Sequence, residues 1–157
     1  LGSYVAADPA LARRCVREGH GIGTHGWTHA LMTHQTARQI QSEWARSAAA
    51  CWKATGCSPM PYCRPPYGAV NAATIRASAA AGYCRMILWD VDPQDWSQPG
   101  AGVIASRVLS HVRPGSIVCM HLTPQTAAAL PAILRGLRAR GFKCVSLPEL
   151  FRAAGRR

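Results

Sequence analysis

The chain has 157 residues and a hydrophobic content of 48%, enough for one domain with a sizeable core and too little for two. No stretch approaches the roughly 18 consecutive apolar residues of a membrane span, and no basic segment followed by an apolar one opens the chain. The net charge of +11 would suit an anionic polymer, but the arginines are dispersed and no nucleic-acid-binding module is present, which argues against nucleic acid as a partner.

The first half of the chain predicts three helices, each preceded by a capping residue and followed by a glycine. Their expected ranges are 8–19, 36–56 and 71–82. In the second of them, Thr36 has Gln39 as its capping-box partner. The second half predicts a helix over 103–112, another that includes 130–137, and a short terminal helix over 148–154. Pro131 lies either in the first turn of its helix or at a kink.

Four segments between these helices have the length and composition of strands, namely 21–25, 86–89, 117–120 and 142–147. Apolar strands that alternate with helices are typical of a parallel arrangement, so we expect an α/β fold with a sheet or barrel buried on both faces. Polar clusters follow several of these strands, at the carboxyl ends where such folds carry their chemistry.

The first polar cluster contains His25 and His29, four residues apart. On one helical turn this spacing places two imidazoles on the same face, where neutral nitrogen donors can bind one divalent ion. The zincin motif of metalloproteases requires Glu after the first histidine, and Gly26 stands there instead, so that class is excluded.

Seven cysteines are many for a cytosolic enzyme, yet no Cys-x-x-Cys pair indicates a zinc ribbon or a thioredoxin-like site. Disulfides of an exported protein are an alternative, and Cys57 and Cys63, on either side of a proline-containing loop, are the first candidates for a pair. Cys119 and Cys144 lie in apolar segments and are expected to be small buried hydrophobic residues.

Four polar clusters, in their order and spacing, resemble the motifs of carbohydrate esterase family 4, the polysaccharide deacetylases with a NodB homology domain. The matching segments are His25-Gly26-Trp27-Thr28-His29, Arg64-Pro65-Pro66-Tyr67-Gly68, Asp92-Pro93-Gln94-Asp95-Trp96 and Cys119-Met120-His121. The resemblance implies a distorted (β/α)7 barrel, with residues 1–157 as a single deacetylase catalytic domain.

By this resemblance His25 and His29 hold a divalent metal, usually Zn²⁺ with Co²⁺ as an alternative, which activates a water molecule. His121 is the implied general acid, and Asp95 keeps its imidazole charged. Arg64 is implied to orient the catalytic base.

The family also implies contacts with the substrate. The backbone amide of Tyr67 is expected to stabilise the oxyanion, with Pro66 and Met120 beside the substrate. Trp96 either stacks on a sugar ring or belongs to the core. Asp90 and Asp92 are either strand-end hydrogen-bond acceptors or further members of the site.

Three departures from the family pattern stand out. The family's Thr-Phe-Asp-Asp segment, whose aspartates are the general base and the third metal ligand, is not in this chain, so we expect an N-terminally truncated domain without its first strand. Gly26 replaces Ser or Thr, which removes a hydrogen bond behind the metal ligands. Cys119 replaces Leu, which enlarges the expected acetyl pocket.

Two hypotheses follow. In the first, the chain is a metal-dependent deacetylase that removes N-acetyl or O-acetyl groups from peptidoglycan, chitin oligomers or acetylxylan. In the second, it is a non-catalytic carbohydrate-binding remnant of that fold that has lost its general base. For either we expect a monomer, secreted or in the cell envelope, whose partner is an acetylated polysaccharide.

Overall fold

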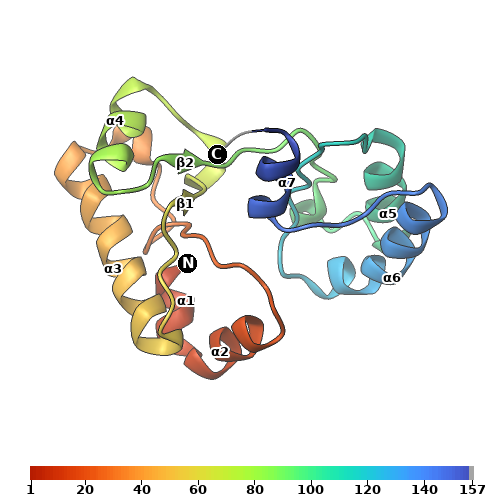
Figure 1. Cartoon of the computed structure of the whole chain (residues 1–157), viewed down its shortest axis with the longest axis horizontal. Coiled ribbons are helices and arrows are strands. Elements are labelled where there is room, and N and C mark those ends of the chain that lie inside the picture. Colours follow the sequence, from red (N-terminus) through yellow and green to blue (C-terminus); the bar gives the residue numbers. More distant parts are fainter. Residues whose placement is uncertain (156–157) are drawn as a thin grey trace. The chain divides into compact units, whose positions relative to one another are not determined.

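The computed structural model describes residues 1–155, which divide into two compact units, Leu1–Ile87 and the chain from Leu88 onward. Helices dominate both units, and the strand pairings are short and parallel (Figure 1). Among the helices of the described part, none is both long and apolar enough to cross a bilayer.

The first unit contains four α-helices: α1 (Gly2–Ala7), α2 (Pro9–Arg17), α3 (Ala37–Thr55) and α4 (Ala72–Ala80). The sequence predicted the last three and their caps. Asp8 accepts a hydrogen bond from the N–H of Leu11 at 3.0 Å, and Gly56 ends α3 in the left-handed region with φ 70°. The prediction did not include α1, which lies against α3 where Gly2 has no room for a Cβ beside Ser47.

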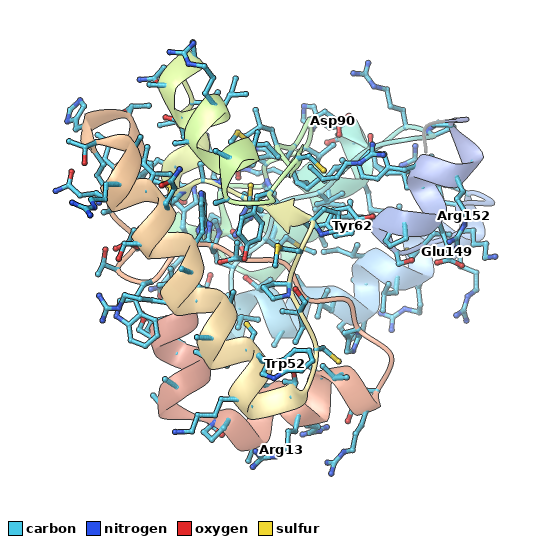
Figure 2. All side chains as sticks on the ribbon, turned by 60° about the vertical axis from the view of Figure 1, so that its left-hand side comes forward. Arg13, Trp52, Tyr62, Asp90, Glu149 and Arg152 are labelled. Atoms are coloured by element: carbon cyan, nitrogen blue, oxygen red, sulfur yellow. The ribbon has the colours of Figure 1, made fainter. Side chains whose placement is uncertain are left out.

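A long-range hydrogen bond joins the middle of α2 to the end of α3. Arg13, labelled on α2 in Figure 2, donates from Nη1 to the carbonyl of Ala54 near the end of α3, at 3.3 Å. The core of this unit lies between α3 and α4, where the buried Trp44 ring packs 5.6 Å from that of Tyr83. The indole N–H of Trp44 donates to the hydroxyl of Ser78 at 2.9 Å, so the polar edge of this buried ring is satisfied.

Parallel pairing in the first unit joins three short segments. Strand β1 (Tyr62–Cys63) pairs with β2 (Arg85–Met86), and Thr24 forms a parallel bridge to Cys63 on the other side of β1. The expected strand over 21–25 is therefore reduced to this bridge, and the one over 86–89 begins one residue earlier and ends sooner. The sequence did not predict β1, because two residues between prolines carry no periodic signal.

The second unit packs α5 (Ala101–His111) against α6 (Pro124–Ala139), with α7 (Leu147–Ala153) at its end. Ile104, Val108, Ile133 and Leu137 form its buried core. Pro131 lies inside α6, which begins seven residues earlier, so the placement of Pro131 in the first turn is wrong. The helix starts at Pro124, behind its capping residue Thr123.

Strands are sparser in the second unit than the sequence predicted. Of the segment 117–120, only Val118 pairs, in a parallel bridge to Val91. The segment 142–147 forms no strand among the described residues, and Cys144 within it is exposed where a buried residue was expected. The prediction of a buried Cys119 is confirmed.

The expected pairing of Cys57 with Cys63 is wrong in this structure. Both thiols are free, and they lie in different environments, Cys57 exposed and Cys63 buried on β1. The sequence reasoning placed both residues beside one loop, but β1 turns the Cys63 side chain into the core.

Candidate functional site

The segment from His25 to His29 is a loop and not the helical turn that the spacing suggested. Gly26 and His29 both have positive φ values, 83° and 62°, which no helix contains. The loop still brings the two imidazoles together, with ring centroids 4.9 Å apart in an edge-to-face arrangement. At Gly26 a Cβ would lie 3.1 Å from Cε of Met32 and 3.2 Å from Oε2 of Glu43, so a glycine fits here better than the Ser or Thr of the family motif.

His25 is held in one tautomer by a backbone carbonyl. Its Nδ1 lies 2.5 Å from the carbonyl oxygen of Arg64, and since a carbonyl only accepts, Nδ1 carries the proton and Nε2 keeps its lone pair. Burial lowers the pKa of His25 to about 4, so the ring is neutral at physiological pH. A neutral imidazole oriented through its other nitrogen is the usual state of a metal-binding histidine.

The cluster around Arg64 lies beside the same two histidines. The N–H of Arg64 donates to the carbonyl of Thr24 at 2.9 Å, which continues the pairing of β1 into the histidine loop. Tyr67, with φ 61°, is 65% exposed, and its ring lies 4.7 Å from that of His29. Pro66, its neighbour in the chain, is buried. The first unit thus gathers four of the residues singled out from the sequence: His25, His29, Arg64 and Tyr67.

Two nitrogen donors on one loop fit part of a site for a borderline divalent ion such as Zn²⁺. Within residues 1–155, no third histidine, cysteine, aspartate or glutamate joins them in a group that could hold a metal. The residues present therefore supply two ligands of the three or four that such sites use.

Glu43, on α3, is a residue of this site that the sequence reasoning missed. Its carboxylate accepts hydrogen bonds from the N–H groups of Trp27 and Thr28, at 2.7 Å and 2.8 Å, and from the hydroxyl of Thr28 at 2.9 Å. The only signal in the sequence was one acidic residue on the apolar face of a predicted helix, near Ile40 and Ser47.

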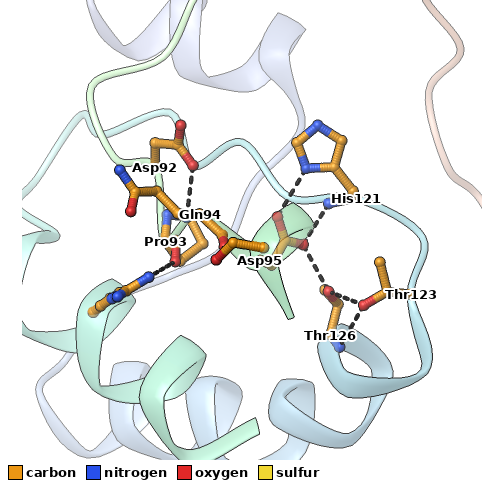
Figure 3. Close-up of polar contacts among 9 residues, drawn as sticks. Asp92, Pro93, Gln94, Asp95, His121, Thr123 and Thr126 are labelled. Carbon is orange, nitrogen blue, oxygen red and sulfur yellow. Dashed lines mark hydrogen bonds and ion pairs between the residues drawn. The ribbon is translucent and has the colours of Figure 1, made fainter. Parts of the chain in front are cut away.

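In the second unit, Asp95 lies at the start of the 3-10 helix η3 (Asp95–Ser97) and contacts His121 twice (Figure 3). Nδ1 of His121 is 2.8 Å from Oδ1 of Asp95, and the backbone N–H of His121 donates to Oδ2 at 2.6 Å. The Asp95 side chain is wholly buried, whereas the His121 side chain is 41% exposed. An accessible imidazole thus lies on a buried carboxylate.

Two threonines complete the surroundings of Asp95, and the sequence reasoning did not identify them. Thr126 donates its hydroxyl to Oδ2 of Asp95 at 2.6 Å, and Thr123 caps α6 beside it (Figure 3). Burial opposes ionisation of Asp95, but the hydrogen bonds from the His121 N–H, the Thr126 hydroxyl and the His121 ring outweigh it and lower its pKa. Asp95 is therefore a carboxylate at neutral pH.

The remaining candidates of this unit differ in their surroundings. Trp96 is 60% exposed and does not belong to the core. Met120 is partly buried and packs against the core of α5 and α6. The aspartates Asp90 and Asp92 are hydrogen-bond acceptors: Asp90 accepts from the N–H of Ile117 at 2.7 Å, and Asp92 accepts from the N–H of Gln94 at 2.7 Å.

Comparison with known proteins places this geometry in context. Residues 1–86 match the polysaccharide deacetylase family. The peptidoglycan-N-acetylglucosamine deacetylase PgdA of Listeria monocytogenes is 35% identical over 96% of this chain, which spans only 32% of that protein. A chitooligosaccharide deacetylase of Bradyrhizobium is 33% identical over 96% of this chain and 75% of its own length.

Solved structures agree with the sequence comparison. The peptidoglycan deacetylase PdaC of Bacillus subtilis has a TM-score of 0.90 at 28% identity, over 99% of this chain and 75% of its own. A carbohydrate esterase family 4 pseudoenzyme of Bacillus anthracis has a TM-score of 0.89 at 27% identity, over 95% of this chain and 52% of its own. The predicted α/β fold of the carbohydrate esterase family 4 type is thereby confirmed.

Proposed function

Because the chain belongs to the polysaccharide deacetylase family, hydrolases that act on carbon–nitrogen bonds, we propose that it removes acetyl groups from a polysaccharide in a metal-dependent reaction. The observation that carries this proposal is the pairing of the accessible His121 imidazole with the buried Asp95 carboxylate. A carboxylate only accepts, so Nδ1 of His121 carries a proton and Nε2 is the atom that can transfer one. In the proposed role as general acid, Nε2 of this histidine would give its proton to the leaving amine.

His25 and His29 are the proposed metal-binding residues, with Zn²⁺ the expected ion and Co²⁺ the alternative. A divalent ion bound there would polarise the acetyl carbonyl and lower the pKa of a water molecule. The hydrogen bond from His25 to the Arg64 carbonyl fixes the imidazole orientation that such binding requires. The backbone N–H of Tyr67 is the proposed donor to the oxyanion, and Arg64 is proposed to orient the base.

The proposed substrate is a glycan that contains N-acetylglucosamine, with acetylxylan as the other candidate. The names of two relatives specify peptidoglycan and chitooligosaccharide, and both of these glycans contain N-acetylglucosamine. Exposed aromatic side chains support sugar binding in each unit, Tyr67 in the first and Trp96 in the second. Pro66, which is buried, and Met120, which is partly buried, are proposed to lie beside the substrate. The expected setting is the cell envelope or the extracellular space, and the expected state is a monomer.

A non-catalytic carbohydrate-binding role is the second candidate. It is favoured by the two-histidine donor set, to which no third ligand is added within residues 1–155. The similarity to a pseudoenzyme of carbohydrate esterase family 4 points the same way. In this role the exposed aromatic residues would bind glycan, and no acetate would be released.

Acetate release from a panel of acetylated glycans separates these candidates. Peptidoglycan, chitopentaose and acetylxylan are each incubated with the protein, with Zn²⁺ or Co²⁺ added, and with His121→Asn as the matched variant. The first candidate predicts acetate release that the variant lacks. Glycan binding without release by either protein would support the second.

A further inference from the structure

We infer that Glu43 is a positioning residue for the two-histidine loop, so that its carboxylate sets the geometry in which His25 and His29 bind a metal. This inference rests on the proposed metal-binding role of the two histidines. It adds a residue from outside the four sequence motifs, on a helix that those motifs do not include.

The contacts of Glu43 are concentrated on the residues between the two histidines. One carboxylate oxygen accepts from two successive backbone N–H groups, those of Trp27 and Thr28, at 2.7 Å and 2.8 Å. The other oxygen accepts from the Thr28 hydroxyl at 2.9 Å. Glu43 is only 8% exposed, so these bonds replace water around a nearly buried group.

Charge strengthens this arrangement. Burial opposes ionisation of Glu43, but the N–H groups of Thr28 and Trp27 and the Thr28 hydroxyl outweigh it and lower its pKa. An ionised carboxylate forms shorter and stronger hydrogen bonds than a neutral acceptor. Arg46, one turn along α3, lies with its guanidinium carbon 4.4 Å from the centroid of the Trp27 ring and holds the same part of the loop from the side.

The loop needs such support because its backbone is strained. His29 has φ 62°, in the left-handed region that a residue with a side chain occupies only when its surroundings hold it there. Thr28, which precedes His29, donates two of the three hydrogen bonds that Glu43 accepts. Glu43 thus acts on the residue whose placement decides where the His29 ring lies.

Helix α3 is a rigid base for this function. Ile40 and Trp44, on either side of Glu43 along the helix, are fully buried in the core of the first unit. One turn further, the hydroxyl of Thr24 donates to that of Ser47 at 2.7 Å, and the N–H of Gly26 donates to the Thr24 hydroxyl at 3.3 Å. The same helix therefore holds both the beginning and the middle of the histidine loop.

Glu43→Ala and Glu43→Gln test the inference together. The alanine variant loses all three hydrogen bonds, whereas the glutamine oxygen can accept from both N–H groups and its amide can donate to the Thr28 hydroxyl. We expect Glu43→Ala to weaken Co²⁺ binding by about 10- to 100-fold in calorimetric titration, the usual effect of removing a group that orients a ligand. Glu43→Gln should restore the affinity to within a few-fold of the original.

Glu149→Ala is the matched control, because Glu149 also accepts from a backbone N–H and a hydroxyl, both of Ser146, and lies on α7 in the second unit (Figure 2). It should leave Co²⁺ affinity unchanged. Thr28→Val removes only one of the three hydrogen bonds, so it tests the inference if Glu43→Ala does not fold. We expect it to lower Co²⁺ affinity by a few-fold.

A second readout makes the inference independent of deacetylation. In the metal-free protein, ¹⁵N spectra of the imidazoles report whether His25 keeps its single Nδ1-protonated tautomer. Loss of that tautomer in Glu43→Ala, with rescue in Glu43→Gln, supports the inference even if no substrate is deacetylated. Unchanged spectra and unchanged Co²⁺ affinity in a folded Glu43→Ala protein would overturn it.

Discussion

Nδ1 of His121 lies 2.8 Å from Oδ1 of Asp95, and the backbone N–H of the same histidine donates to the other carboxylate oxygen at 2.6 Å. Two hydrogen bonds from one residue to a carboxylate with no exposed surface fix both the ring and the backbone of His121. This explains how an imidazole that is 41% exposed can still keep one orientation.

Asp95→Asn should separate proton transfer from metal binding. The amide retains the shape of the carboxylate but removes its charge, so deacetylation should fall by about 10²- to 10⁴-fold, the usual contribution of a positioned acid and its support. Co²⁺ affinity should stay unchanged, since the histidine loop lies in the other unit. Kinetics of acetate release and calorimetry on the same preparation measure both; full activity would remove Asp95 from the reaction.

The same substitution should change how stability depends on pH. The pKa of Asp95 is lowered in the folded protein, so its contribution to stability is present above the pKa of the unfolded chain and is lost as pH falls through the folded value. Asp95→Asn should therefore flatten the loss of unfolding free energy on acidification below about pH 4, where an unfolded aspartate titrates. Urea unfolding at a series of pH values tests it, and an identical acid dependence in both proteins would contradict it.

Thr126→Val should destabilise the protein because it leaves Oδ2 of the buried Asp95 with one hydrogen bond fewer. The loss of a bond to a charged group costs about 1.5–3 kcal/mol of unfolding free energy. Ser110→Ala is the control, since Ser110 is an exposed residue of α5 whose hydroxyl bonds only within its own helical turn and to His111. Equal unfolding midpoints for the two variants would argue against the Asp95 network.

His25 should give the protein a second pH-dependent term. Its pKa falls from the ordinary 6.5 to about 4 on folding, mainly through burial. Between these values the unfolded chain binds more protons, so stability rises with pH, by at most about 1.4 kcal/mol per pH unit for one proton. His25→Gln, measured in chelator, should reduce the slope between pH 4 and 6.5. An unaltered slope would contradict the burial of a neutral His25.

Trp96→Ala should weaken binding of polymeric substrate without affecting the fold, since 60% of Trp96 is exposed. Stacking of an aromatic ring contributes on the order of 1 kcal/mol, which predicts a several-fold rise in KM. Trp52→Ala is a matched control: Trp52, labelled on α3 in Figure 2, is 63% exposed and is not a candidate site residue. If both variants have the same KM as the parent protein, Trp96 does not contact the glycan.

The sequence predicted the helices well because their signals are local. Asp8, Thr36 and Asn71 each accept the capping hydrogen bond that their type suggested. Strands were predicted less well, because pairing depends on neighbours distant in the chain. The segment 142–147 has strand composition, yet it forms no strand in the described chain.

The candidate site shows the same division. Motifs identified His25, His29, Asp95 and His121 as candidates, because their residue types are suited to metal binding and proton transfer. They did not identify Glu43 on α3 or Thr126 in the first turn of α6. An acidic residue on a helix and a threonine near a helix start both have many ordinary roles. The helical placement of the histidine pair was wrong, since spacing alone does not reveal the positive φ values at Gly26 and His29.

The most direct test of the account is chelator-dependent acetate release from chitopentaose. We predict release by the protein with Zn²⁺ or Co²⁺, its loss on treatment with a chelator, its return when the ion is added back, and no release at any step from the His25→Ala/His29→Ala double variant. Release that persists in the double variant, or that survives complete removal of divalent metal, would contradict the assignment of these two histidines to a metal-dependent deacetylase.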